Sequence, residues 1–387
     1  MTSLAIRGGV AHLDSAWREV HVAIEDASIT AVGSTTETPA ERIVDATGCS
    51  VLPGFIDLQI NGAVGVDFST QPERIGEVAE YLVQCGVTSF MPTVISSSPD
   101  DTMHAISVIG TWSQESQQSP GARSLGVHLE GPFLNPERAG AHPPHRLRPP
   151  SLTEVRAWLA EPGVAMVTIA PELPGAIEVI EYLVANGVAV CAGHTAADAA
   201  QLSAAVGAGI RGVTHLFNAM GPMSARVPGP AGAALTHPAL IAGLIADGIH
   251  VDPAMVRLAW HVLGPSRTML VTDAISALGL PHGEYSVGDT SLVVDDTGAR
   301  TSDGVLAGSV LRLDEAVRNL IEFTGCSLAD ASIAGSVTPA RLAGRRNLGR
   351  IATGYTADIV VLDERNEAVV TIVGGQVAFD PQERCSG

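Results

Sequence analysis

The chain has 387 residues and a formal net charge of -19 at pH 7, with 46% hydrophobic and 16% charged residues. This length allows a large domain plus a smaller one, and so acidic a chain is a poor partner for nucleic acid or for an anionic membrane surface. All 22 basic residues are arginine. The absence of lysine excludes Schiff-base chemistry, a lysine-bearing phosphate loop and a carboxylated lysine that bridges two metal ions.

The sequence carries no pattern of a membrane or exported protein. No segment approaches the roughly 18 to 20 consecutive apolar residues of a transmembrane helix, and the N-terminal residues lack the basic and apolar regions of a signal peptide. The five cysteines are scattered without a Cys-x-x-Cys pair, which fits a reducing compartment. We therefore expect a cytoplasmic location and no membrane partner.

Both ends of the chain are rich in short strand-forming segments separated by polar turns. They lie at 3–7, 19–24 and 29–32 near the N-terminus, and at 357–362 and 368–373 near the C-terminus. Two strand-rich ends around a different middle predict one small β-sandwich domain, made of residues 1–52 and 346–387. The boundary is placed at the Leu-Pro-Gly turn around Pro53.

Residues 53–345 alternate between strand-like and helical segments. Eight segments have the apolar composition of buried parallel strands, at 55–60, 87–93, 125–130, 165–170, 188–194, 212–217, 241–247 and 268–273. Helical patterns lie between several of them, at 73–85, 152–160, 175–186, 196–208 and 253–263. Eight alternating βα units favour an α/β fold with a closed (β/α)8 TIM-like barrel, since the doubly wound alternative lacks its Gly-rich phosphate turn. A turn-rich, β-leaning insertion is expected at 283–310, followed by a helix near 314–323.

Four residues suited to metal and proton chemistry stand at the ends of these strand segments: Glu130, His194, His215 and Asp273. The carboxyl ends of barrel strands converge on one mouth, so we expect these side chains to meet there. Two His and one Glu form a ligand set that leaves a position open for water, as catalytic zinc sites require. A nearby carboxylate, here Asp273, can accept a proton from that water and later pass it to the leaving group.

Several motifs resemble those of a known family. The amidohydrolase superfamily is indicated by DATGCSVLPGFID at 45–57 and GYTADIVVLD at 354–363. A narrower resemblance, to the N-acetylglucosamine-6-phosphate deacetylases, rests on HLEGPFLN, GHT, THLFNAM, DGIH, VTDA and LAGS, which begin at 128, 193, 214, 247, 271 and 306. The match runs in order through nearly the whole chain, and HLEGPF followed by THLFNAM is its most specific part.

The resemblance implies an enzyme that hydrolyses the acetamide of N-acetylglucosamine 6-phosphate to acetate and the free amine. It implies that His142 hydrogen-bonds the substrate near the acetyl group and helps to stabilise the oxyanion. It also implies that Asn218, the backbone of Ala219 and His250 hold the sugar and phosphate. Arg226 is the planar cation that a phosphate requires. Because the family places this arginine across a dimer interface, we expect a homodimer in which Arg226 reaches the neighbouring active site.

Gln59 and Asn61 stand where the superfamily often has a His-x-His pair. Side chains two residues apart share one face of a strand, but amides are poor zinc ligands. The sequence therefore predicts one tightly bound divalent metal per chain, with Zn²⁺ preferred over Fe²⁺, Mn²⁺ or Co²⁺. A weak second metal at these substituted positions remains an alternative.

Three other functions stay open. The substrate could be N-acetylgalactosamine 6-phosphate, which differs at one hydroxyl. Cyclic-amide hydrolysis usually relies on the His-x-His pair and often on a bridging lysine, and this chain has neither. An inactive scaffold on the same barrel is the third alternative, but such a protein tends to lose the ligands that this chain retains.

Overall fold

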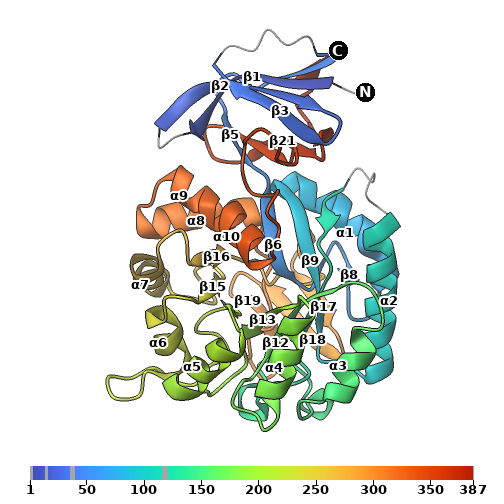
Figure 1. Cartoon of the computed structure of the whole chain (residues 1–387), viewed down its shortest axis with the longest axis vertical. Helices are drawn as coiled ribbons and strands as arrows, with labels where there is room; N and C mark the ends of the chain where they lie inside the picture. The colour runs from blue at the N-terminus through green and yellow to red at the C-terminus, as the bar shows by residue number, and fades with distance from the viewer. Residues whose placement is uncertain (1–2, 14–15, 35–39, 116–120, 387) are drawn as a thin grey trace.

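The computed structural model describes residues 3–13, 16–34, 40–115 and 121–386. Residues 1–2, 14–15, 35–39 and 387 of the predicted small domain lie outside these ranges. Figure 1 shows a small β domain stacked on a larger α/β body, with both chain termini in the small domain. No helix among the described residues is both long and apolar enough to cross a membrane.

The small domain is built from strands of both chain ends. From the N-terminal end come β1 (Ser3–Leu13), β2 (Ala16–Glu25), β3 (Ser28–Gly33), β4 (Arg42–Asp45) and β5 (Ser50–Pro53). The C-terminal end adds β20 (Ile359–Leu362), β21 (Ala368–Val373), β22 (Gln376–Phe379) and β23 (Cys385–Ser386). The pairing order β22-β21-β20-β5-β1-β2-β3 joins the two ends where β5 meets β20. Ile29 of β3 and Ile372 of β21 share one hydrophobic cluster, so the sheet folds over on itself and encloses a core of its own.

The larger body is the predicted (β/α)8 barrel. Its parallel strands are β6 (Phe55–Ile60), β9 (Val87–Ile95), β11 (Val127–Glu130), β12 (Val164–Ile169), β13 (Ala189–Ala192), β14 (Gly212–Val213), β15 (Ile241–Leu244) and β16 (Thr268–Leu270). They pair in chain order from β6 to β16, and each matches one predicted segment. The fold class is thereby confirmed. Almost every strand residue is buried, as expected where helices cover a parallel sheet.

Helices surround the barrel, and their capping residues explain where they begin and end. The main ones are α1 (Ile75–Leu82), α2 (Pro99–Glu115), α3 (Leu152–Trp158), α4 (Ala176–Ala185), α5 (Ala199–Ala208), α6 (Gly229–Thr236), α7 (Pro253–Leu263) and α8 (Leu313–Thr324). After α8 come α9 (Leu328–Ser332), a π-helical turn at Ile333–Val337 and α10 (Thr338–Leu342). The helix predicted at 196–208 begins later than expected, because Asp198 and Gln201 form a capping box that fixes its first turn.

The barrel closes between its first and last strands, β6 and β16, without a ladder among the described residues. An isolated parallel bridge joins Ile60 to Ala274. The N–H of Asp273 donates to the carbonyl of Gln59 at 2.8 Å, and the N–H of Asn61 donates to the carbonyl of Ala274 at 2.7 Å. This seam places the residues that follow β16 directly beside the end of β6.

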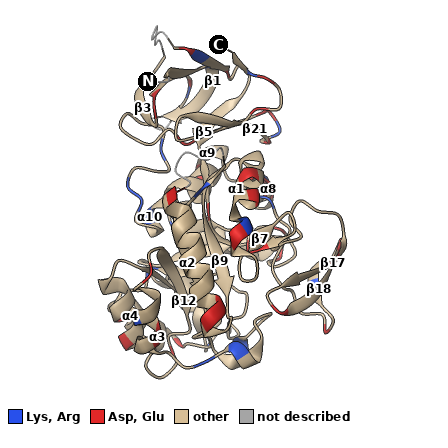
Figure 2. Cartoon of the chain, turned by 90° about the vertical axis from the view of Figure 1, so that its right-hand side faces the viewer, with Lys and Arg blue, Asp and Glu red and all other residues tan. Residues whose placement is uncertain are grey.

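The predicted β-leaning insertion forms a three-stranded antiparallel sheet of β17 (Gly283–Val287), β18 (Thr290–Asp295) and β19 (Gly298–Thr301). Figure 2 shows this sheet beside the barrel. In the same view the visible barrel strands carry few charged residues compared with the outer helices and loops. The buried carboxylate of Asp67 accepts the N–H of Gly288 at 2.9 Å, and the hydroxyl of Thr290 donates to the carbonyl of Ala141 at 3.4 Å. The insertion is thus attached to the loops at the mouth of the barrel.

Candidate metal and catalytic site

The strand ends bring the four predicted chemistry-bearing residues into one cavity. Glu130 ends β11, while His194, His215 and Asp273 follow β13, β14 and β16. Their exposed fractions are 2%, 4%, 4% and 9%, respectively. The cavity has a volume of about 220 Å³. The polar residues that line it are Asn61, Glu130, His142, His194, His215, Asn218, His250 and Asp273. The small residues Gly140, Ala141 and Ala219 also line it.

Three of these residues have a backbone conformation that L-amino acids rarely adopt. The φ angles of His194, His215 and Asp273 are 48°, 26° and 50°. A left-handed backbone at a non-glycine residue is unfavourable and persists where the surrounding structure imposes it, which is most often at functional sites. In this barrel it turns each side chain into the cavity immediately after a short strand.

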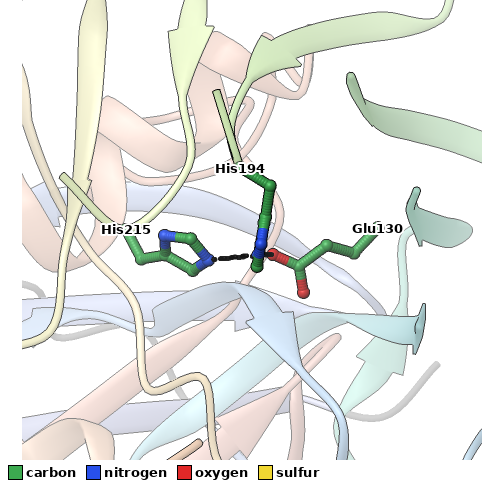
Figure 3. Close-up of side chains that lie close together, drawn as sticks. All are labelled: Glu130, His194 and His215. Atoms are coloured by element: carbon green, nitrogen blue, oxygen red, sulfur yellow. Dashed lines mark hydrogen bonds and ion pairs between the residues drawn. The ribbon is translucent and has the colours of Figure 1, made fainter. Parts of the chain in front are cut away.

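Glu130, His194 and His215 point their polar atoms at one another (Figure 3). Oε1 of Glu130 lies 3.2 Å from Nε2 of His194 and 3.0 Å from Nε2 of His215, and the two Nε2 atoms are 3.0 Å apart. One ligand atom from each residue lies within 4.8 Å of the others. Three buried donor atoms of this kind converge on a volume that suits one cation.

The hydrogen bonds around the trio fit a metal ion. Nδ1 of His194 lies 2.9 Å from the carbonyl of Arg138, and a carbonyl only accepts, so Nδ1 carries the proton of the neutral ring. The lone pair of His194 Nε2 therefore faces the carboxylate of Glu130. Two acceptors this close need a cation between them. An outer hydrogen bond that fixes the ring in this tautomer is typical of metal-binding histidines.

The pKa values of Glu130 and His215 also indicate that this position favours a positive charge. Burial raises the pKa of Glu130, but the neighbouring imidazoles of His194 and His215 outweigh burial and bring this pKa well below its usual value. Burial lowers the pKa of His215, but the hydrogen bond and charge of Glu130 prevail and raise it to about 9. A positive charge beside Glu130 is therefore favoured, and a metal ion bound by the trio would supply it.

Asp273 is a buried carboxylate next to the trio. Gln59 donates from Nε2 to Oε1 of Glu130 at 3.1 Å and to Oδ1 of Asp273 at 3.2 Å, and Asn61 donates to the same Oδ1 at 2.8 Å. Burial and the charge of Glu130 raise the pKa of Asp273 to about 6. A carboxylate whose pKa lies near neutrality can both accept and return a proton. The two amides, expected to be poor metal ligands, hold the carboxylates instead.

His142 is fixed as a neutral hydrogen-bond donor. Its Nδ1 accepts the N–H of Ser96 at 3.3 Å and lies 2.9 Å from the hydroxyl of Ser96. Since Nδ1 accepts, the proton of the neutral ring lies on Nε2, which is 3.9 Å from Glu130 Oε2. Burial and the neighbouring His194 lower the pKa of His142 to about 3. The ring therefore stays neutral and presents an N–H rather than a base.

The predicted sugar-binding residues also reach the cavity. Nδ1 of His250 lies 2.7 Å from Oδ2 of Asp247, whose other oxygen accepts the N–H groups of Ile249 and His250. Asn218 and Ala219, on the loop after β14, also line the cavity. Ala219 has a left-handed φ of 51°. His250 is thereby oriented by a carboxylate that leaves its Nε2 available.

Arg226 lies elsewhere in the chain's own structure. It is exposed, within the exposed segment Met223–Val227, and is absent from the residues that line the cavity. No arginine lines this cavity among the described residues. The predicted phosphate reader therefore does not reach the site of its own chain.

Other residues at or near the site were missed by sequence reasoning. Asp57 is fully buried on β6, and burial raises its pKa to about 7 against the hydrogen bonds from Thr272 and Gln59 that lower it. Ser96 orients His142, and Asp247, the first residue of the DGIH motif, orients His250; neither of them was assigned a role from the sequence. An apolar wall also lines the cavity, formed by Ile95, Ile275, Val287, Val305, Leu306 and Ala307. The insertion contributes Val287, for which the sequence held no signal.

A larger cavity, of about 600 Å³, lies at the opposite end of the barrel near Arg123 and Arg345. Arg123 pairs with the buried Asp358. The described residues that line it include no histidine, aspartate or glutamate. It therefore lacks the groups that metal or proton chemistry requires, and the smaller cavity is the candidate active site.

Comparisons with known proteins agree with this geometry. The amidohydrolase family model matches residues 50–378. The chain is 38% identical to N-acetylglucosamine-6-phosphate deacetylase of Bacillus subtilis, over 94% of this chain and 93% of that protein. The structure of N-acetylglucosamine-6-phosphate deacetylase from Thermotoga maritima has a TM-score of 0.88 and 32% identity, covering 97% of this chain and 99% of that one. The structure of a mutant of the Mycobacterium smegmatis deacetylase in complex with N-acetyl-D-glucosamine-6-phosphate has a TM-score of 0.89 and 30% identity, covering 98% of this chain and 100% of that one. The chain therefore belongs to the amidohydrolase family and, within it, to the N-acetylglucosamine-6-phosphate deacetylases.

Proposed function

We propose that this protein hydrolyses the acetamide of N-acetylglucosamine 6-phosphate to glucosamine 6-phosphate and acetate. The observation that carries the proposal is the buried Glu130, His194 and His215 trio beside Asp273, at the mouth of the barrel in a chain of this family. The trio would hold one divalent ion, which we take to be Zn²⁺ because two imidazoles and one carboxylate are a common catalytic zinc set. When bound there, the ion would supply a Lewis acid able to polarise the acyl carbonyl and to make a water more acidic.

Asp273 performs the proton transfers. Its carboxylate accepts a proton from the water whose oxygen attacks the acyl carbon, and it returns that proton to the nitrogen as the carbon–nitrogen bond breaks. The amide N–H groups of Gln59 and Asn61 hold Oδ1, so Oδ2 remains the atom for proton transfer. His142 donates its Nε2–H to the carbonyl oxygen, where negative charge develops in the transition state.

Recognition of the sugar phosphate requires a second copy of the chain. Asn218, the backbone of Ala219 and His250 would contact the sugar and one side of the phosphate. Since no arginine among the described residues lines the cavity, we assign the phosphate to Arg226 from the neighbouring copy of a homodimer. A bidentate arginine matches the geometry of a phosphate better than any other side chain in this chain.

We further propose that the small domain comprises residues 1–52 and 346–387, that the barrel comprises 53–345, and that the protein is cytoplasmic. Nine terminal strands in one sheet support the division. The location is supported by five cysteines that are all free, as is usual in a reducing compartment.

An acetate-release assay with a panel of sugars tests the function. The panel contains N-acetylglucosamine 6-phosphate, N-acetylgalactosamine 6-phosphate and unphosphorylated N-acetylglucosamine. We expect the first to have the highest kcat/KM and the third the lowest. A preference for the galacto epimer would replace the substrate but keep the chemistry, whereas absence of acetate release from every sugar by metal-loaded protein would refute the proposed function.

A further inference from the structure

The barrel seam contains a buried carboxylate that no described cation neutralises. Asp57, on β6, has an exposed fraction of 0%. None of the ion pairs formed by the described residues includes Asp57. A buried acid without a counter-ion is unfavourable unless hydrogen bonds compensate it. Residues that break such a rule are found mainly where function requires them.

The partners of Asp57 are all at the seam. Its Oδ2 accepts the hydroxyl of Thr272 at 2.5 Å, and its Oδ1 accepts the N–H of Thr272 at 3.3 Å and the N–H of Gln59 at 3.2 Å. One carboxylate thus joins the two strands that otherwise meet through an isolated bridge. Thr272, which donates to Oδ2 of Asp57, directly precedes Asp273 in the chain.

Two partners of Asp57, Gln59 and Thr272, also determine the position of Asp273. Gln59 accepts the N–H of Asp273 with its backbone carbonyl at 2.8 Å and donates to Oδ1 with its side chain at 3.2 Å. Thr272 is tied on its other side as well, because its carbonyl accepts the hydroxyl of Ser309 at 2.6 Å. Asp57 therefore contacts two of the residues that hold the strained backbone of Asp273, whose φ is 50°.

We propose that Asp57 and Thr272 form a positioning pair that sets the orientation of the Asp273 carboxylate for proton transfer. The inference rests on the proposed function, because it assigns the pair a role in the step that Asp273 performs. Neither residue lines the cavity, so neither touches the substrate. Their bond fixes the backbone from which Asp273 projects, and a misplacement of about 1 Å at a reacting group can lower a rate by roughly 100-fold.

Thr272→Val is the first test, because valine keeps the shape of threonine and removes only the hydroxyl. We expect kcat for N-acetylglucosamine 6-phosphate to fall by about 10- to 100-fold, with KM, bound metal and calorimetric affinity for glucosamine 6-phosphate unchanged. Thr272→Ser restores the hydroxyl and should return kcat close to the wild-type value. Thr371→Val is the matched control, since Thr371 is a fully buried threonine in the small domain whose hydroxyl donates to the carbonyl of Val83 at 2.7 Å.

A double mutant separates positioning from general stability. If Asp57 acts through Thr272, Asp57→Asn combined with Thr272→Val should be no slower than the slower single variant. A double mutant whose loss in kcat equals the product of the two single losses would contradict the proposed pair. So would an unchanged kcat in folded Thr272→Val, or the same loss in the Thr371→Val control.

Two further results keep the test decisive. If Thr272→Val does not fold, the comparison of Asp57→Asn with Thr272→Ser decides: a kcat loss in the first with unchanged metal content supports the pair, and an unchanged kcat overturns it. The proposed function fails separately, because wild-type protein would then release no acetate from any sugar of the panel.

Discussion

At the carboxyl end of the barrel strands, acids and imidazoles face one another across a buried cavity, whereas at the amino end arginines bind backbone carbonyls. Arg267 donates to the carbonyls of Leu235, His237 and Val262, each at 3.0 Å. Arg211 does the same for Val206 and Ile210, at 3.0 and 2.7 Å. These carbonyls belong to the last turns of α5, α6 and α7 or follow them, where carbonyls lack helical partners and carry partial negative charge.

The polar groups at the amino end stabilise the fold, whereas those at the carboxyl end are arranged to bind a ligand. Each hydrogen bond of Arg267 pairs its guanidinium with a backbone carbonyl that the helix end leaves without a helical partner. At the other end, one oxygen of Glu130 and the Nε2 atoms of His194 and His215 face one another, and Nδ1 of His215 and Oδ1 of Asn61 are buried without a hydrogen-bond partner among the described residues. Removing groups at one end should therefore lower stability, and removing groups at the other should lower activity.

Metal removal is expected to have the largest effect. Chelation should abolish acetate release, because no remaining residue would supply the Lewis acid that makes the attacking water more acidic. Adding a divalent ion back should restore the rate at one equivalent per chain, since Gln59 and Asn61 replace the second ligand pair. A titration in which activity appears only after two equivalents would contradict the single-metal site.

Asp273→Asn should have the next largest effect. The amide keeps the size of the carboxylate but cannot carry a proton at neutral pH, so kcat should fall by at least the roughly 10²- to 10⁴-fold of one proton-transfer step. Metal content and substrate affinity should persist. A loss of bound metal that excess metal reverses would instead identify Asp273 as a ligand.

Arg226→Ala should weaken the phosphorylated substrate selectively. Loss of a charged hydrogen bond costs about 1.5–3 kcal/mol, which is roughly 10- to 150-fold in kcat/KM. The unphosphorylated sugar serves as the control and should be much less affected. Mixing this variant with Asp273→Asn protein should recover part of the activity, because a hybrid dimer contains one complete site; equal losses for both sugars would exclude Arg226 as the phosphate reader.

Arg267→Met should change stability alone. It removes three hydrogen bonds from a charged donor at the amino end, and we expect the free energy of unfolding to drop by about 1.5–3 kcal/mol with kcat and KM unchanged. Arg18→Met, at an exposed position of β2, is the control and should leave both stability and activity at the wild-type level. A fall in kcat for folded Arg267→Met would contradict the claim that polar groups at the amino end of the barrel contribute to stability and not to activity.

The sequence predicted the parts of the molecule that rest on local patterns. The barrel and the trio were both predicted from apolar segments that end in Glu130, His194, His215 or Asp273. Burial makes these strands apolar, and function places a polar residue at the end of each. Helix α6 was not foreseen, since its Gly-Pro-Ala-Gly start resembles a loop. It forms because its residues are buried against the barrel.

The supporting residues could not be predicted because their roles depend on contacts between distant strands. Asp57 and Thr272 are separated by 215 positions, and nothing in either local sequence indicates that they are bonded. Gln59 was interpreted through what it replaces rather than through the two carboxylates that it joins. The homodimer and the identity of the metal depend on atoms outside the chain and stay predictions.

The pairing of β5 with β20 also governs the order in which the chain can fold during synthesis. Leu52 and Val360, partners in this ladder, are roughly 300 residues apart, which at ~5–20 residues per second delays their meeting by on the order of 15 to 60 s. Until then the edge of β5 has no partner strand, and an unpaired edge invites association with other chains. The barrel strands, whose neighbours follow closely in sequence, can pair much earlier, so the domain that is begun first on the ribosome is the last to be completed.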